Sequence, residues 1–146
     1  MEQTITTAIV AAKTSLKELS ELSPECALKV GNLRQNYQSY EDFNLRVNPD
    51  TQVKFAADER KTIMGDYSTL AMLDMAFGEK ASSSWLVSLL TNLNLFSGSK
   101  NMDDGQTESL AYLLAQEYRD MKYSVMQLFF FRFKCGDFGK FYGKVS

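Results

Sequence analysis

The chain has 146 residues, of which 45% are hydrophobic and 23% charged, and this composition is typical of a globular protein. The length suits one core, so we predict a single domain over residues 1–146, with a glycine-punctuated tail at 136–146. Histidine is absent, which excludes serine or cysteine nucleophiles that His activates. Two distant cysteines argue against a disulfide framework and a zinc site. We therefore expect no catalytic residue, metal or cofactor, and a protein that is not an enzyme.

The opening residues lack a basic region followed by an apolar one, so we expect no secretory signal. The longest apolar stretches, at 70–77 and 125–131, are too short to span a bilayer. Together with two cysteines that we expect to stay reduced, these features predict a cytoplasmic protein without membrane contact.

The first third of the chain predicts two helices and a loop. Apolar residues at three- and four-residue spacing predict an amphipathic helix over 4–22. Ser23-Pro24-Glu25 then marks a new helix start, with Pro at the first helical position, and this short helix is expected to run through Val30 and stop at Gly31. Residues 36–50 show no sustained period and are predicted to form a long loop that ends in a turn at Asn48–Thr51.

The middle of the chain predicts three more helical segments. Residues 53–64 have a charged helical pattern that Gly65-Asp66 interrupts, and the pattern resumes over 67–77 before Gly78. Three serines at 82–84 can cap a helix through 85–96.

The last third predicts two further helices. Asp103 can cap the first, and Gln106 stands where a capping box places its return bond. Its expected buried stripe is Leu110, Ala111, Leu113, Leu114 and Tyr118. A final helix is expected from about Ser124 to Lys134. Because no segment alternates β-branched residues, the predicted fold is all-α, a single-domain irregular bundle of about five to six helices.

Aromatic and basic residues are concentrated at the end of the chain. Residues 119–146 hold six basic and two acidic side chains, a net charge of +4, whereas residues 1–118 carry −6. In the final helix, we expect one face to close the core and Tyr123 and Phe131 to lie off it. The buried face is predicted to consist of Met126, Phe129, Phe130 and Phe133.

The basic and aromatic residues at the end of the chain that are not on this buried face are candidates for contact with a partner. Basic side chains could bind phosphates, and aromatic rings could stack on the bases of single-stranded nucleic acid. The candidate contact residues are Arg132, Lys134, Lys140, Phe141, Tyr142 and Lys144. The alternative is that the tail folds back and is buried against the domain.

The segment from about Leu90 to Val145 carries several distinctive motifs. These are Met-Asp-Asp-x-Gln (102–106), Leu-Ala-x-Leu-Leu, then Leu-Phe-Phe-x-Arg-Phe-Lys-x-Gly (128–136) and Phe-Gly-Lys-Phe-Tyr-Gly (138–143). In these motifs the segment resembles the C-terminal part of small uncharacterised all-α proteins of Bacteroides-type phages and mobile elements. The resemblance implies no assigned activity, but its context is that of phage and plasmid replication accessories.

Two functional hypotheses follow. The first is a non-enzymatic binding protein, specifically a DNA-replication accessory of a phage or mobile element, with single-stranded DNA or a replication protein as partner. The alternative is a protein–protein interaction or assembly module without nucleic-acid contact. In that case the tail, or the face of the helix at 85–96, would dock a partner or a second copy of the chain. This hypothesis therefore allows a homo-oligomer.

Overall fold

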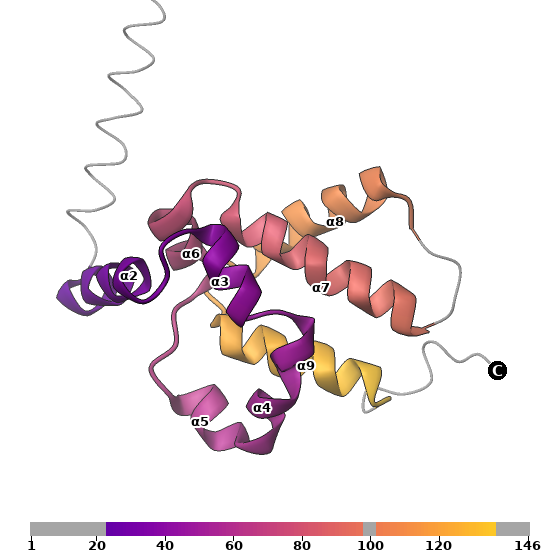
Figure 1. The fold of residues 1–146 in the computed structure, drawn as a ribbon, viewed down its shortest axis with the longest axis horizontal. Coiled ribbons are helices and arrows are strands. Elements are labelled where there is room, and N and C mark those ends of the chain that lie inside the picture. Colours follow the sequence, from indigo (N-terminus) through magenta and orange to yellow (C-terminus); the bar gives the residue numbers. More distant parts are fainter. Residues whose placement is uncertain (1–22, 98–101, 137–146) are drawn as a thin grey trace, which may run out of the picture.

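The computed structural model describes residues 23–97 and 102–136, and these form an all-α fold (Figure 1). The predicted fold class is therefore confirmed, and the expected five to six helices are close to what is found. The helix predicted over 4–22 lies outside the described residues. The helices, in chain order, are α2 (Pro24–Asn36), α3 (Tyr40–Arg46), the 3-10 helix η1 (Pro49–Thr51), α4 (Gln52–Ala57), α5 (Glu59–Met64), α6 (Leu70–Phe77), α7 (Ala81–Ser97), α8 (Asp104–Glu117) and α9 (Tyr123–Lys134).

Two predicted helix starts are confirmed by their caps. The Oγ of Ser23 accepts a hydrogen bond from the backbone N–H of Cys26 at 3.1 Å, and α2 begins at Pro24. At α8, the N–H of Gln106 donates to Asp103 Oδ1 at 2.8 Å, and the N–H of Asp103 donates back to Gln106 Oε1 at 3.1 Å. This reciprocal pair is the predicted capping box.

The prediction that α2 stops at Gly31 is wrong, because the helix continues to Asn36. Val30 and Leu33 are both buried one turn apart along α2, and α2 packs against α6. Near the end of α2, the Arg34 guanidinium donates to the carbonyls of Met75 and Ala76. Packing of the apolar face therefore outweighs the helix-breaking tendency of one glycine.

The long loop predicted over residues 36–50 is also wrong, since it contains α3. The Ser39 side chain caps this helix through the N–H of Asp42, and Phe43 is completely buried. The segment looked unperiodic because seven residues supply only one large buried side chain. The turn predicted at Asn48 is present, where Asn48 Oδ1 accepts from the N–H of Asp50 at the start of η1.

Residues 53–64 form two short helices rather than one. The chain breaks at Asp58, whose Oδ1 accepts from the N–H of Lys61 and caps α5. The buried Thr62 hydroxyl donates to the carbonyl of Phe55 at 2.6 Å and so ties α5 back to α4. The predicted interruption at Gly65-Asp66 is confirmed, because α5 ends at Met64.

The core is built around a cluster of aromatic rings. The ring centroid of Phe43 lies 5.0 Å from that of Tyr37, 5.2 Å from Tyr123, 5.9 Å from Phe77 and 6.1 Å from Trp85. The Trp85 indole N–H is also satisfied, because it donates to the carbonyl of Val47 at 2.8 Å. Tyr123 is buried, which corrects the expectation that it lies off the packed face.

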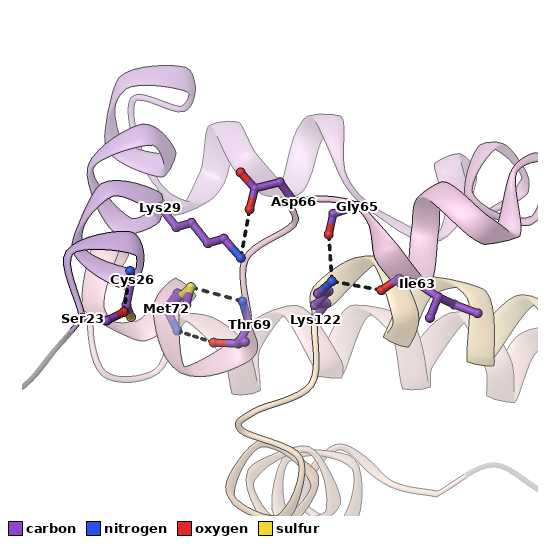
Figure 2. Close-up of polar contacts among 9 residues, drawn as sticks. All are labelled: Ser23, Cys26, Lys29, Ile63, Gly65, Asp66, Thr69, Met72 and Lys122. Atoms are coloured by element: carbon purple, nitrogen blue, oxygen red, sulfur yellow. Dashed lines mark hydrogen bonds and ion pairs between the residues drawn. The ribbon is translucent and has the colours of Figure 1, made fainter.

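Two connecting segments cross beside this cluster and fix the start of α9. The N–H of Leu70 donates to the carbonyl of Met121, and the N–H of Tyr123 donates to the carbonyl of Ser68, both at 2.9 Å. Figure 2 shows Lys122 beside them, with its Nζ donating to the carbonyls of Ile63 at 2.9 Å and Gly65 at 2.7 Å. A cation at these carbonyls satisfies acceptors that the end of α5 leaves open.

The face of α9 that packs on the core is more polar than predicted. Met126 and Phe130 are buried as expected, but Phe129 is 42% exposed and Phe133 is only partly buried. Ser124 and Gln127 are buried instead. The Ser124 hydroxyl donates to the carbonyl of Thr62, and the Gln127 amide donates to the carbonyl of Asn48, both at 2.8 Å. Side-chain bonds to the backbone of neighbouring elements thus set the face that α9 buries.

Candidate partner-binding surface

The two described basic residues among the candidate contacts lie at the end of α9, and both already have partners in the fold. Arg132 forms an ion pair with Glu59 at the start of α5. The Lys134 ammonium donates to Asn92 Oδ1 on α7 at 2.7 Å and lies 5.9 Å from the ring centroid of Phe96. Burial lowers the pKa of Lys134. These contacts attach the end of α9 to both α5 and α7.

The other four candidate contacts lie outside the described residues: Lys140, Phe141, Tyr142 and Lys144. The structure thus brings Arg132 and Lys134 onto one end of α9 and does not place the rest.

A different surface emerges from the way α8 packs. Its buried positions are Thr107, Ala111 and Ala115, which recur every four residues along one face. Figure 1 shows α8 alongside α7, and α7 is its main neighbour. Small side chains at this spacing let two helices approach closely. The sequence contained this signal, but larger apolar residues nearby concealed it.

The buried stripe predicted for α8 is therefore partly wrong. Ala111 is buried and Leu110 and Leu114 are half-buried, whereas Leu113 is 62% exposed and Tyr118 is 43% exposed. Tyr112 is also 58% exposed. Because the small-residue stripe faces α7, adjacent leucine and tyrosine side chains turn toward solvent. An apolar pair at 112–113 is left on the surface of a charged helix.

A groove of about 430 Å³ lies between α7 and α8, next to this pair. Val87 and Tyr112 give it apolar walls, and hydroxyl and charged groups complete its lining. Its lining residues are Lys80, Ser83, Ser84, Val87, Glu108 and Tyr112. A volume in this range is comparable to that of sites that hold small ligands or a few side chains of a partner.

The groove belongs to an acidic part of the molecule. The described residues of the α7–α8 pair, 79–97 and 102–118, contain five acidic side chains and one basic side chain, a net charge of −4. The opposite balance holds over α4, α5 and α9, where residues 52–64 and 122–134 carry six basic and two acidic side chains. Three of those six bases, however, are the internally bonded Lys122, Arg132 and Lys134. The acidic surface therefore has the clearer electrostatic signature.

One partly buried carboxyl near the start of α7 has a structural role. Asp74 on α6 accepts hydrogen bonds from both the N–H and the hydroxyl of Ser82, at 2.8 and 2.9 Å. Burial raises the pKa of Asp74, while the bonds from Ser82 act in the opposite direction. These bonds anchor the first turn of α7 to α6 and so hold one wall of the groove in place.

Residues 23–97 and 102–136 contain no group of three or more His, Cys, Asp or Glu side chains that could hold a metal ion. Among the helices formed by the same residues, none combines the length and apolar character needed to cross a bilayer.

Comparison with protein families relates the end of the chain to other sequences. A family of unknown function, DUF6633, matches residues 101–146, a stretch that contains α8, α9 and the residues after them. The match supports the resemblance of this part of the chain to an uncharacterised family. No curated protein and no solved structure matches the chain.

Proposed function

We propose that the protein is a non-enzymatic module that binds a protein partner through the surface formed by α7 and α8. The observation that carries this proposal is the exposed pair Tyr112 and Leu113 beside the groove. Aromatic side chains are enriched at protein interfaces, where they bury a large apolar area on a rigid frame. Helix α8 can present them because Ala111 and its small neighbours already provide the contact with α7.

The charge of this surface indicates the chemistry of the partner. Acidic side chains around an apolar centre favour a partner segment that carries basic residues beside apolar ones. Glu108 lines the groove together with Lys80, and Asp103 and Asp104 add negative charge at the start of the same helix. Charges at the rim steer association, and the apolar pair supplies most of the affinity.

The test begins with a partner captured by the 146-residue chain from cells that express it, followed by measurement of Kd for the purified pair. Replacing both Tyr112→Ala and Leu113→Ala should raise Kd about tenfold or more, since hot-spot residues contribute more than about 1 kcal/mol each. Leu45→Ala is the matched control, because Leu45 is 77% exposed on α3 and does not line the groove. Equal effects of the two variants, or none from the double variant, would reject the proposal.

A second candidate is the binding of single-stranded DNA, as a replication accessory of a phage or mobile element. The net charge of +4 over residues 119–146 favours it, together with the aromatic residues interleaved with Lys140 and Lys144. Phosphate contacts release counterions, so binding must weaken as salt rises. Titration of labelled single-stranded DNA at about 50 and 200 mM salt tests this candidate. Binding absent at low salt, or unchanged by salt, removes it.

A further inference from the structure

The exposed side of α8 has an apolar pair with a carboxylate on each side. Tyr112 and Leu113 form this pair, and both are exposed. Glu108 is exposed one helical turn before Tyr112, and Glu117 is exposed one turn after Leu113. Helix α8 itself contains no basic residue. Lys80 lines the neighbouring groove together with Glu108, and the net charge of −4 over the α7–α8 pair already includes it.

The end of α5 has the same arrangement with the opposite charge. Ile63 and Met64 form an apolar pair at its last two positions, where they are 48% and 75% exposed. Arg60 is exposed one helical turn before this pair. Figure 2 shows the Lys122 ammonium at the C-terminal end of the helix, where it donates to the carbonyls of Ile63 and Gly65. Cations thus flank the apolar pair of α5, as carboxylates flank that of α8.

The carboxylates of α5 and its N-cap are occupied within the fold. Asp58 accepts a hydrogen bond from the N–H of Lys61 and caps the helix. Glu59 forms its ion pair with Arg132 of α9. The exposed cations of α4 and α5 are Lys54, Arg60 and Lys61. Residues 52–64 and 122–134 therefore carry a net charge of +4, which complements the −4 of the α7–α8 pair.

The two surfaces lie on opposite edges of the molecule. Helix α8 packs on α7, α7 contacts α9, and α9 packs on α4 and α5. Figure 1 shows this order, with α8 at one edge, α4 and α5 at the other, and α7 and α9 between them. A contact between the α8 surface and the α5 surface therefore requires two molecules.

From these observations we propose that the partner of the α7–α8 surface is a second copy of this chain, which presents its α5 surface. The apolar pair of α8 packs against Ile63 and Met64 of the second copy, and Glu108 and Glu117 face its cations. This inference rests on the proposed function, because it names the partner of the same surface. The two surfaces differ, so the contact is heterologous, and the assembly grows head to tail or closes into a ring.

Mixing two variants tests the heterologous contact. Tyr112→Ala with Leu113→Ala removes the apolar pair of α8, and Ile63→Ala with Met64→Ala removes that of α5. In analytical ultracentrifugation, the 146-residue chain should form species that grow with protein concentration, whereas each variant alone should remain monomeric. The equimolar mixture should form a heterodimer and nothing larger, because each variant keeps the surface that the other lacks. Leu45→Ala is the matched control and should associate like the unmodified chain.

Reversal of charge gives a second measurement. Glu108→Lys with Glu117→Lys should weaken self-association about tenfold or more, and so should Arg60→Glu with Lys61→Glu, because each change brings like charges together. A mixture of these two variants should regain part of the association, since the reversed α8 of one faces the reversed α5 of the other. Raised salt should weaken the association of the unmodified chain by screening the paired charges.

Three results would overturn the proposal. The first is an unmodified chain that stays monomeric at every concentration, and the second is undiminished association of the Ile63→Ala, Met64→Ala variant. The third is the absence of a heterodimer from two monomeric variants whose thermal unfolding shows that both are folded. None of these results changes the Kd of a captured partner, so a different partner that depends on Tyr112 and Leu113 would keep the proposed function and remove only the second copy.

Discussion

Two regions of this molecule bury their surfaces in opposite ways. The aromatic core places Phe43 against four other rings from α6, α7, α9 and the segment before α3, and Phe43 has no exposed surface. The α7–α8 contact instead uses small side chains such as Ala111 and leaves Tyr112 and Leu113 in solvent. The first arrangement buries a large apolar area. The second leaves its larger apolar side chains exposed, so burial there contributes less to stability. Stability should therefore depend on the core, and recognition on the α7–α8 surface.

The largest predicted effect is on the core. Phe43→Ala should lower the free energy of unfolding by about 3–5 kcal/mol, because it removes a completely buried ring and leaves a cavity. Chemical denaturation measures the loss as a lower midpoint at unchanged slope. Leu45→Ala, on the same helix but 77% exposed, should change stability by less than about 0.5 kcal/mol. Similar losses for both variants would contradict the central place of Phe43.

An intermediate effect is expected where the core joins α5. Lys122→Met should cost about 1–2 kcal/mol, because the carbonyls of Ile63 and Gly65 lose the charged donor that Figure 2 shows. Amide exchange should report the loss first at the end of α5. Lys61→Met, on the exposed side of α5, serves as the control and should be nearly neutral. If Lys122→Met is equally neutral, the contact does not contribute to stability.

The pH dependence of the free energy of unfolding should also report on the core rather than on the α7–α8 surface. Burial raises the pKa of Tyr123 above its ordinary value of 10.0, and burial with the nearby Glu41 carboxylate raises the pKa of Tyr40 to about 12. Above pH 10.0 the unfolded chain loses phenolic protons that the folded chain keeps, so stability should fall as pH rises toward about 12.

Denaturation series at pH 9, 10 and 11 measure this slope, at values that bracket the ordinary tyrosine pKa. Tyr123→Phe should make the fall of stability with pH shallower, because it removes one of the two phenol groups whose pKa is raised in the folded chain. A slope identical to that of the unmodified protein would show that Tyr123 does not contribute to it.

The smallest effect on stability is expected on the α7–α8 surface. Tyr112→Ala with Leu113→Ala should change the free energy of unfolding by no more than about 0.5 kcal/mol, because both side chains are mostly exposed and alanine favours the helix. The same variant is predicted to abolish most partner binding. A loss of several kcal/mol in thermal or chemical denaturation would instead show that these residues contribute to the folding core. It would contradict the contrast between the core and the α7–α8 surface.

The sequence predicted features that depend on a few neighbouring residues. The start of α2 at Pro24 and the capping box of Asp103 with Gln106 were predicted correctly, because a cap involves residues within one turn of each other. The breaks near Gly65 and Gly78 were local as well. The contact roles of Arg132 and Lys134 remain predictions, with the structure adding their bonds to Glu59 and Asn92.

Features that depend on distant partners were missed. Gly31 lies inside α2 because Val30 and Leu33 are buried and α2 packs against α6, a helix about forty residues away along the chain. Tyr123 is buried because the rings of Phe43, Phe55, Tyr67 and Trp85 surround it. These four residues come from four segments that are distant along the chain, and the segment that holds Phe43 was predicted to be a loop. The groove was not predictable at all, since its two walls come from separate helices.

The sequence by itself thus determined that the described chain is helical, where α2 and α8 begin and that its ending mixes aromatic and basic residues. It could do so because helix caps, helix-breaking residues and composition act over short distances along the chain. Only the tertiary structure decided which face each helix buries. Helix α8 turns Thr107, Ala111 and Ala115 toward α7 and exposes its larger apolar side chains, because close packing of two helices is a property of the pair and cannot be derived from either one alone.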